Sequence, residues 1–423
     1  DADGDGFAFE GGTCGVSDCD DSNPLVNPNA AEVCDNGIDD NCNGKIDAED
    51  AACGAPPNII VVGWDGAQRD HLMECYNQQL PECSAGLPNL AALGGGMVYD
   101  STITSGDTAT KPGWAQIFSG YNAEVLGIYS NGDYQPIPEG YTVFEKLENN
   151  FGDENIVTMF ISGKSIHTGA ACVGDSTYEN GQPVTEDQGQ PWCLTKDHLD
   201  YYENDLRQNL VVGNRALELL ETHQNDLFFA SFIFRVPDVI GHIGGENSSQ
   251  YTQAIVGDDI WLGNIVDKLV ELGIDDRTLI YVTTDHGFDE DGNTHGNAPY
   301  TFLVTNDPLV VREGDRKDIA PTILERYGIS LGPLGNAPAV DGFSLYSFPA
   351  FECVPEGQAF IDYEGAPACC SGLSLISLDR AFNRNLFTYA TGGTGDNSGY
   401  CTACGDGICT EPENFLNCSA DCN

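Results

Sequence analysis

The sequence predicts an α/β fold: a mostly parallel central sheet sandwiched by helices, with small disulfide-rich loop modules at both ends. Three observations lead to this prediction. Short apolar runs alternate with longer amphipathic segments between residues 58 and 347, which is typical of parallel strands connected by helices. Cysteines gather near both ends of the chain. The two end regions also lack the periodicity of helices or strands.

The domain boundaries follow from these changes in pattern. Residues 1–54 are rich in Asp, Asn, Gly and Cys, and they end at the stiff segment Gly54-Ala55-Pro56-Pro57. Periodicity fades again after about Phe351. We therefore expect a module at 1–54, a large α/β domain at 55–350 and a Cys-rich module at 351–423.

The large domain contains the predicted sheet and its covering helices. We expect strands at 59–62, 156–160, 227–232, 279–282 and 301–304, and helices at 199–221, 249–272 and 319–327. In sheets of this kind the ligand site lies beyond the carboxyl ends of the strands. Several Asp and His residues follow the predicted strands directly, so we expect the functional site at that edge.

Cysteine placement indicates the cellular compartment. Of 17 cysteines, five precede residue 54 and eight lie from Cys353 onward. This distribution favours disulfide-stapled modules and a secreted or cell-surface protein in an oxidising environment. A zinc ribbon is the alternative, but the terminal segments contain no histidine and many Asp residues. The odd cysteine count leaves one cysteine unpaired or paired between chains, and the second case would allow self-assembly.

The charge excludes several classes of partner. A net charge of −49 opposes binding to nucleic acid or to an anionic membrane surface, and makes divalent cations natural partners. No apolar run approaches the ~20 residues that a membrane-spanning helix needs. The sequence starts at Asp1-Ala2-Asp3, which has the character of a mature or trimmed terminus, so the lack of a leader is uninformative.

The N-terminal module has the spacing of a calcium-binding loop. Oxygen-bearing side chains occupy the ligand positions of an EF-hand loop that starts at Asp39, with glycine at position six. These residues are Asp39, Asn41, Asn43, Asp47 and Asp50. Asp1, Asp3 and Asp5 repeat the first half of the pattern, and its closing carboxylate would come from Asp18, Asp20 or Asp21. The segment resembles Asp/Cys-rich metal-binding repeats of secreted bacterial proteins. We expect bound calcium; a solvated acidic loop is the alternative.

Four segments of the large domain carry groups suited to catalysis. Asp65 ends the first predicted strand, and Thr110 lies two residues before a proline that can open a helix. Helix N-termini stabilise anions, although each of these residues alone is explained by a turn or a helix cap. The other two segments contain Asp238 with His242, and Asp285 and His286 followed by His295. Carboxylate and imidazole groups are good zinc ligands.

Read in order, these segments resemble the alkaline-phosphatase superfamily, and most of all its nucleotide pyrophosphatase/phosphodiesterase branch. The resemblance spans about residues 58–347 and rests on Asp65-Gly66, Thr110-x-Pro112, Asp238-x-x-x-His242, Asp285-His286-Gly287 and His295. It implies a secreted phosphoester hydrolase with two zinc or similar ions, and we expect phosphodiesters ahead of monoesters as substrates. The alternative is a calcium-dependent structural or filament protein that uses the hydrolase fold as a scaffold.

The resemblance also implies a role for each site residue. Asp238, His242 and His295 would bind one ion, and Asp65, Asp285 and His286 the other. Thr110 would attack phosphorus and form a phospho-threonine, while Asn131 would donate to a phosphoryl oxygen. Lys111 is a candidate for binding the extra charge of a monoester. His295 departs from the relatives of that branch, whose last histidine lies much farther along the chain.

Sulfatases share this fold but use a nucleophile made from Cys or Ser within a Cys/Ser-x-Pro-Ser-Arg segment. Thr110-Lys111-Pro112-Gly113-Trp114 does not supply that nucleophile. We therefore do not expect sulfate ester hydrolysis as the main activity.

Overall fold

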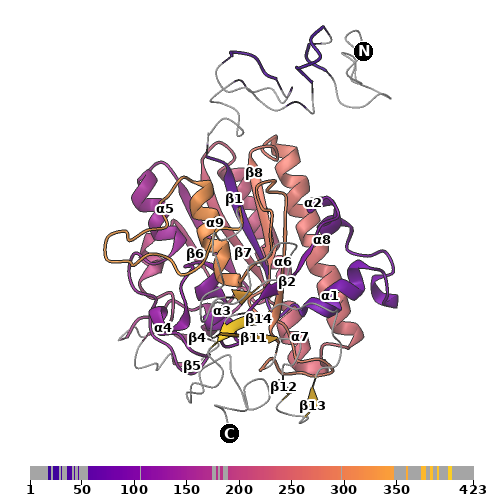
Figure 1. Cartoon of the computed structure of the whole chain (residues 1–423), viewed down its shortest axis with the longest axis vertical. Coiled ribbons are helices and arrows are strands. Elements are labelled where there is room, and N and C mark those ends of the chain that lie inside the picture. The colour runs from indigo at the N-terminus through magenta and orange to yellow at the C-terminus, as the bar shows by residue number, and fades with distance from the viewer. Residues whose placement is uncertain are drawn as a thin grey trace.

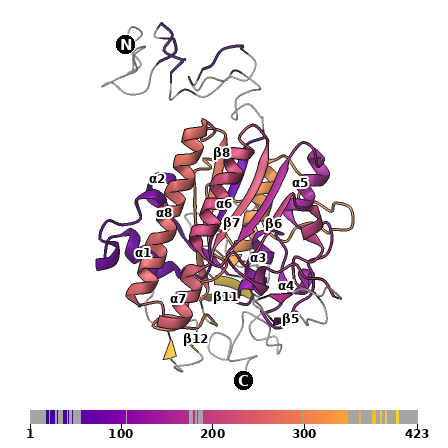
Figure 2. The ribbon, with the colours of Figure 1, turned by 180° about the vertical axis from the view of Figure 1, so that it is seen from behind.

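A seven-stranded sheet flanked by helices on both faces forms the centre of the computed structural model (Figures 1 and 2). The structure describes residues 18–20, 22–27, 30, 36–40, 42, 46, 56–104, 106–173, 178–179, 182–183, 189–296, 298–346, 359–360, 373–377, 382–383, 388–389 and 399–402. The strand order in the sheet is β2-β9-β8-β1-β7-β3-β6. Strands β8, β1, β7, β3 and β6 run parallel, whereas β9 and β2 are antiparallel to their neighbours.

The elements of the large domain have the following bounds. The strands of the sheet are β1 (Asn58–Trp64), β2 (Tyr99–Ile103), β3 (Val157–Ser162), β6 (Tyr201–Glu203), β7 (Phe228–Phe234), β8 (Thr278–Thr283) and β9 (Tyr300–Thr305). The helices are α1 (Arg69–Tyr76), α2 (Pro88–Leu93), α3 (Thr110–Ile117), α4 (Ala123–Leu126), α5 (Val143–Phe151), α6 (Asn209–Thr222), α7 (Val236–Gly244), α8 (Ser249–Leu272) and α9 (Ile319–Arg326).

The central strand β1 shows why this sequence forms a sheet covered on both faces. Its run of β-branched residues is buried along its whole length, as expected for a parallel strand with helices on either side. Ile59 and Val61 pack into one core with side chains of α3, α5 and α9. Ile60 and Val62 pack into a second core with α1, α2, α6 and α8. The two cores hold the helices in place and leave the strand ends to carry the site.

The structure confirms the predicted α/β fold and corrects some of its elements. The predicted helix at 199–221 is wrong at its start, because residues 201–203 form the edge strand β6 beside β3, and α6 begins at Asn209. Asp205 and Arg207 have φ angles of 57° and 62°, which a helix does not admit. The strand β2 was not predicted, and the strand predicted at 301–304 pairs antiparallel to β8.

Short strands form the described part of the C-terminal region. There β10 (Ala359–Phe360), β14 (Gly399–Thr402) and β11 (Ser374–Ser377) make a three-stranded antiparallel sheet, and β12 (Phe382–Asn383) pairs with β13 (Thr388–Tyr389). In the large domain, a separate short pair consists of β4 (Tyr178–Glu179) and β5 (Gln182–Pro183). The sequence predicted a tail module without the periodicity of helices or strands, so these short strands were not predicted.

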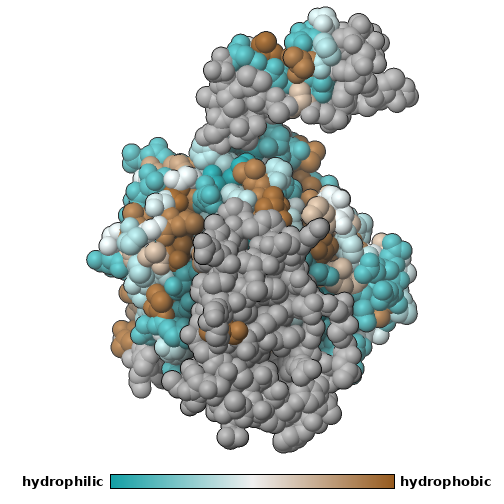
Figure 3. Space-filling view, viewed as in Figure 1, coloured by the Kyte–Doolittle hydropathy of each residue, from teal (hydrophilic) through white to brown (hydrophobic). Residues whose placement is uncertain are grey.

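Disulfides join cysteines in the N-terminal module and in the large domain. The described pairs are Cys19–Cys42, Cys75–Cys83 and Cys172–Cys193. On the face drawn in Figure 3, hydrophobic residues of the described surface are scattered among hydrophilic ones. Among the described helices, none has both the length and the apolar character to cross a membrane.

Candidate active site

Four neighbouring strands of the sheet deliver charged side chains to one edge. Asp65 follows β1, Asp285 and His286 follow β8, and Lys164 follows β3. Asp238 lies in the first turn of α7, immediately after β7. Because β8, β1, β7 and β3 are adjacent and parallel, their carboxyl ends meet. Helix α3, which begins at Thr110, packs against the same edge, and all of its residues are buried.

Two glycines allow the backbone to approach these carboxylates closely. Gly66 has a φ of 68°, and a Cβ atom there would lie 2.7 Å from Cβ of Asp238. A Cβ atom on Gly113 would lie 2.6 Å from Cβ of Asp285. The first turn of α3 therefore rests directly on the carboxyl end of β8. This contact sets the position of Thr110 relative to the acidic residues.

The structure brings the six predicted metal ligands together. Ligand atoms of Asp65, Asp285 and His286 lie within 4.8 Å of one another, as do those of Asp238, His286 and His295. Nε2 of His242 lies 3.4 Å from Oδ1 of Asp238. The first group matches one predicted metal site, and His286 also faces the second group. The assignment of each residue to a metal ion stays a prediction.

Hydrogen bonds fix the tautomers of two of these histidines. Nδ1 of His286 lies 2.9 Å from the carbonyl oxygen of Gly287, and Nδ1 of His242 lies 3.0 Å from that of Asn293. A carbonyl oxygen only accepts, so each Nδ1 is the donor and each Nε2 of the neutral ring carries a lone pair. Those lone pairs point toward Asp238, whose Oδ1 lies 3.8 Å from Nε2 of His286. In metal sites, a hydrogen bond from the other ring nitrogen to a carbonyl oxygen orients a histidine ligand in this way.

Burial and mutual repulsion shift the pKa values of the carboxylates. Burial, reinforced by the charge of Asp285, raises the pKa of Asp65 to about 7. Burial also raises the pKa of Asp285 to about 6, although Lys164 opposes the shift. Asp238 is buried too, but Lys164 and His242 hold the pKa of its carboxyl well below the usual value. Burial and His286 lower the pKa of His295 to about 4. Asp238, by contrast, raises the pKa of His242. Burial therefore favours neutral rings at His286 and His295, and the buried carboxylates need positive charge nearby.

Unsatisfied oxygen atoms show that the cluster fits divalent cations. Oδ1 of Asp238 and Oδ2 of Asp285 are buried and accept no hydrogen bond in the described part of the chain. An unpaired buried carboxylate oxygen is costly. Two oxygens of this kind facing imidazole lone pairs are the donor set that zinc-like ions bind. The residues present therefore fit the metals that the sequence predicted.

Lys164 is a site residue that the sequence analysis missed. Its Nζ lies 2.8 Å from Oδ1 of Asp65 and also forms an ion pair with Oδ2 of Asp238. The side chain is 8% exposed, so the contact is buried. Its position two residues after β3, at the ligand-binding edge of a parallel sheet, was the only signal in the sequence. Lys164 supplies one positive charge among three aspartates.

The predicted nucleophile and its neighbours lie beside the acidic cluster. Oγ1 of Thr110 lies 3.3 Å from Nε2 of His286. The backbone N–H of Lys111 donates to Oδ1 of Asn131 over 2.9 Å, which leaves the Nδ2 end of that amide as its donor end. The ammonium group of Lys111 lies 3.0 Å from the centre of the Tyr134 ring. The first turn of α3 thus carries Thr110 and, through the Lys111 N–H, holds Asn131 of the loop after α4 next to it.

A disulfide between Cys172 and Cys193 closes a segment that follows Lys164. In that region, burial, followed by the charges of Lys164 and Lys111, lowers the pKa of His167 to about 3. His167 is therefore neutral beside the two lysines.

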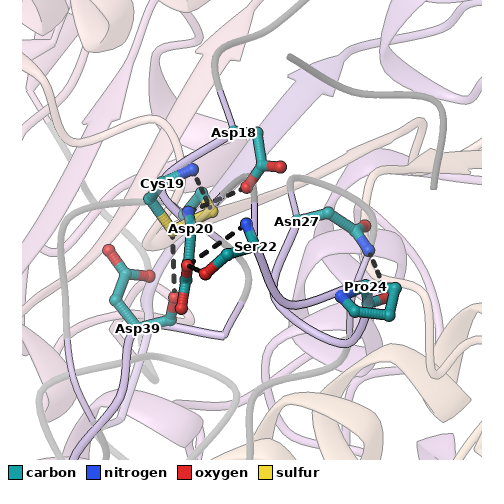
Figure 4. Close-up of a disulfide and its surroundings, with 8 residues drawn as sticks. Asp18, Cys19, Asp20, Ser22, Pro24, Asn27 and Asp39 are labelled. Carbon is teal, nitrogen blue, oxygen red and sulfur yellow. Dashed lines mark hydrogen bonds between the residues drawn. A yellow bond between two sulfur atoms is a disulfide. The ribbon is translucent and has the colours of Figure 1, made fainter. Parts of the chain in front are cut away.

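The described part of the N-terminal module gathers acidic residues around a disulfide (Figure 4). The backbone N–H of Asp20 donates to Oδ1 of Asp18 over 2.9 Å, and Asp39 lies beside the Cys19–Cys42 bridge. Asp18 is fully buried, and its Oδ2 has no hydrogen-bond partner within the described residues. The other predicted calcium ligands, Asp1, Asp3, Asp5, Asn41, Asn43, Asp47 and Asp50, lie outside the described residues.

Comparisons with known proteins agree with this geometry. Residues 59–319 match the model of the type I phosphodiesterase / nucleotide pyrophosphatase family. Residues 18–48 match the model of a metal-binding motif named for copper binding. The solved structure of the yidJ protein of Bacteroides fragilis, assigned as a sulfatase, has a TM-score of 0.51 at 13% identity, covering 69% of this chain and 77% of that one. At that identity the likeness shows the fold alone.

Curated relatives match parts of the chain. The 2,3-bisphosphoglycerate-independent phosphoglycerate mutase of Wolbachia pipientis wMel is 34% identical over 135 residues, covering 30% of this chain and 26% of that protein. Human bis(5'-adenosyl)-triphosphatase ENPP4 is 21% identical over 242 residues, covering 56% of this chain and 49% of that protein. The chain thus spans about half or less of these relatives. Since the family model covers well over half of the 423 residues, the chain belongs to the type I phosphodiesterase / nucleotide pyrophosphatase family, with an alkaline-phosphatase-like fold.

Proposed function

We propose that the protein is a secreted phosphoester hydrolase that uses Thr110 as nucleophile beside two zinc-like ions. The observation that carries this proposal is the position of Thr110 at the N-terminus of α3, with Oγ1 3.3 Å from Nε2 of His286. Asp65, Asp285 and His286 would hold one ion, and Asp238, His242 and His295 the other. When bound, the two ions supply positive charge for the nucleophile and the leaving oxygen.

The residues of the chain perform the two steps as follows. Oγ1 of Thr110 gives its proton to solvent and bonds to phosphorus, while the bond from phosphorus to the leaving oxygen breaks. The leaving group takes a proton and departs, and the product is a phospho-threonine. Water then attacks phosphorus from the vacated side and the bond from phosphorus to Oγ1 breaks. A proton from the attacking water restores the Thr110 hydroxyl, and phosphate or a phosphomonoester is released. The N-terminus of α3 and Nδ2 of Asn131 stabilise the phosphoryl oxygens throughout.

Phosphodiesters fit this site better than phosphomonoesters. A monoester carries more negative charge than a diester and needs a further cationic group. Both lysines of the site are engaged, Lys111 over the ring of Tyr134 and Lys164 between Asp65 and Asp238. Thr110 supports phosphate rather than sulfate esters, because it is not a residue that yields the sulfatase nucleophile.

A panel of substrates tests this proposal. Purified protein is loaded with zinc and assayed on bis(p-nitrophenyl) phosphate, p-nitrophenyl phosphate and p-nitrophenyl sulfate. We expect fastest turnover of the diester, and loss of activity in Thr110→Ala without loss of zinc. Wild-type rates in Thr110→Ala would contradict the role of Thr110. Turnover of the sulfate ester alone would contradict the substrate class.

We also propose that the N-terminal module binds calcium. The support is the buried, unpartnered Oδ2 of Asp18, the acidic residues around the Cys19–Cys42 disulfide, and the loop spacing from Asp39 to Asp50. Extracellular calcium modules bind at about 10⁻⁴–10⁻³ M, so protease protection of residues 1–54 should appear at millimolar calcium. The name of the matching motif makes copper the competing ion. Equal cleavage with and without calcium, but protection by copper, would reverse the assignment.

A further inference from the structure

A second group of acidic residues lies outside the catalytic cluster. Glu246, in the connection between α7 and α8, meets Glu290 and Asp291 of the loop between β8 and β9, and we call these residues the Glu246 cluster. One carboxylate oxygen from each lies within 4.8 Å of the other two. Glu246 is 2% exposed. A buried carboxylate among other carboxylates requires a compensating partner.

The orientation of each carboxylate is fixed by a donor from the surrounding chain. The backbone N–H of Asp291 donates to Oε1 of Glu246 over 2.8 Å. Nδ2 of Asn247 donates to Oδ1 of Asp291 over 2.9 Å, and Nε2 of Gln68 donates to Oε2 of Glu290 over 3.1 Å. The oxygens are therefore held near one another by bonds that supply no full positive charge.

An unsatisfied histidine nitrogen points into the cluster and is independent of the acidic residues. His71 is 3% exposed, and its Nε2 lies 2.9 Å from Oγ1 of Thr252. Oγ1 of Thr252 also lies 3.4 Å from the carbonyl oxygen of Ser248, and when it donates its proton there, Nε2 of His71 is the donor in the contact with Thr252. In the neutral ring, Nδ1 then carries a lone pair.

That lone pair faces a carboxylate. Nδ1 of His71 lies 3.4 Å from Oε2 of Glu246 and makes no hydrogen bond within the described residues. Two acceptors that face one another in a buried position repel unless a cation, or a water bound to a cation, lies with them. This arrangement therefore indicates a missing positive ligand.

The wider surroundings of the cluster are also acidic. Asp70 and Glu74 of α1 lie close enough to act on Glu290. Burial, followed by the charges of Glu246, Asp70, Asp291 and Glu74, raises the pKa of Glu290 to about 7. The nearby Arg69 forms its ion pair with Asp70, at 2.7 Å. The carboxylates of this region thus outnumber the cationic side chain that faces them.

We propose that Glu246, Glu290 and Asp291 bind a divalent cation of the calcium class, with Nδ1 of His71 accepting a hydrogen bond from a water on that cation. Carboxylate oxygens from a loop and a buried connection are the ligands that calcium prefers. Two of the three carboxylates are exposed, which gives the cation a path from solvent. The site is separate from the proposed catalytic ions and from the N-terminal module.

The cation would restrict the movement of the loop that carries His295. The backbone N–H of Glu246 donates to the carbonyl oxygen of Gly292 over 3.0 Å, and Oγ1 of Thr294 donates to Oδ2 of Asp289 over 2.6 Å. Asn293 of the same loop accepts from Nδ1 of His242. Fixing Glu290 and Asp291 to Glu246 therefore fixes the part of this loop that carries His295 and contacts His242.

Hydrogen exchange of the full chain tests the site directly. Protein freed of metals is mixed with Ca²⁺ alone, and exchange is followed by mass spectrometry in peptides covering residues 287–296. With a Kd of about 10⁻⁴–10⁻³ M, ~10 mM calcium should slow exchange in these peptides about 10-fold or more. Unchanged exchange in wild-type protein would overturn the proposal, whatever the variants do.

Variants separate this site from the other two. Glu246→Gln combined with Glu290→Gln should abolish the calcium effect on 287–296, whereas the matched pair Glu218→Gln and Glu221→Gln on the exposed side of α6 should retain it. Asp291→Asn provides a second variant if the buried Glu246 substitution prevents folding. Asp285→Asn should retain the effect, because calcium binding here needs no catalytic ion. Loss of protection in Asp285→Asn, or full protection without Glu246 and Glu290, would overturn the proposal.

Discussion

Replacing Lys164 with methionine removes the only described side-chain ammonium that is paired with the aspartates of the active site. The Nζ atom lies 2.8 Å from Asp65 and also pairs with Asp238, with 8% of the side chain exposed. Removing one partner of a buried ion pair costs about 3–5 kcal/mol, because the remaining charge stays buried. At about 2–4 °C per kcal/mol for a domain of this size, metal-free Lys164→Met should melt about 6–20 °C below wild type.

The loss should depend on pH and on metal. Asp65 has its pKa raised to about 7, so at pH 5 its carboxyl is largely protonated and needs Lys164 less than at pH 8. Bound zinc also supplies positive charge to the same carboxylates, so zinc should reduce the difference between variant and wild type. Both effects follow from one cause, which is uncompensated charge on Asp65 and Asp238.

Differential scanning calorimetry at pH 5 and pH 8, with and without zinc, measures these differences. Lys268→Met is the matched control, because Lys268 pairs with Glu221 and Glu271 at the surface and its loss should cost little. Equal melting temperatures for metal-free wild type and Lys164→Met at pH 8 would refute the reasoning. A loss of the same size at both pH values would refute the role assigned to Asp65.

Three other predictions concern the same site. Raised pKa values mean that the folded metal-free protein binds protons more tightly than the unfolded chain does. Its stability should therefore fall as pH rises from about 4 through about 7, by an amount on the order of 4 kcal/mol for Asp65, and Asp65→Asn should remove that part of the dependence in urea titrations. Gly113→Ala should lower activity by more than tenfold, since its Cβ would meet Asp285 at 2.6 Å and displace Thr110; an unchanged kcat would contradict this. His242→Ala should bind one zinc per chain instead of two by elemental analysis, and two retained ions would show that His242 is not a ligand.

Strands and long helices were predictable because their residues specify them locally. Helix α8 has the bounds that the sequence predicted, since Ser248 caps its N-terminus by accepting from Tyr251 N–H and Gly273 ends it with a φ of 66°. The edge strand β6 was missed, because its pairing with β3 depends on the sheet and not on its own short segment. The antiparallel direction of β9 was missed for the same reason, because it depends on the pairing with β8 in the folded sheet.

The site residues differ in the same way. Asp65, Asp238, Asp285 and the histidines stand in recognisable spacings, and the structure places them together. Lys164 belongs to no spacing pattern, and only the adjacency of β1, β7 and β3 brings it to the aspartates. The Glu246 cluster likewise joins residues of two connections that pack together only in the fold.

Trapping the covalent intermediate tests the central claim most directly. Zinc-loaded protein is mixed with bis(p-nitrophenyl) phosphate, quenched with acid during turnover, digested and mapped by mass spectrometry, with Thr110→Ser and Thr110→Ala treated in parallel. We predict a phosphoryl group that retains one p-nitrophenyl ester on residue 110 in wild type and Thr110→Ser, and none in Thr110→Ala. Turnover in wild type with no adduct on residue 110, together with full activity in Thr110→Ala, would contradict the account.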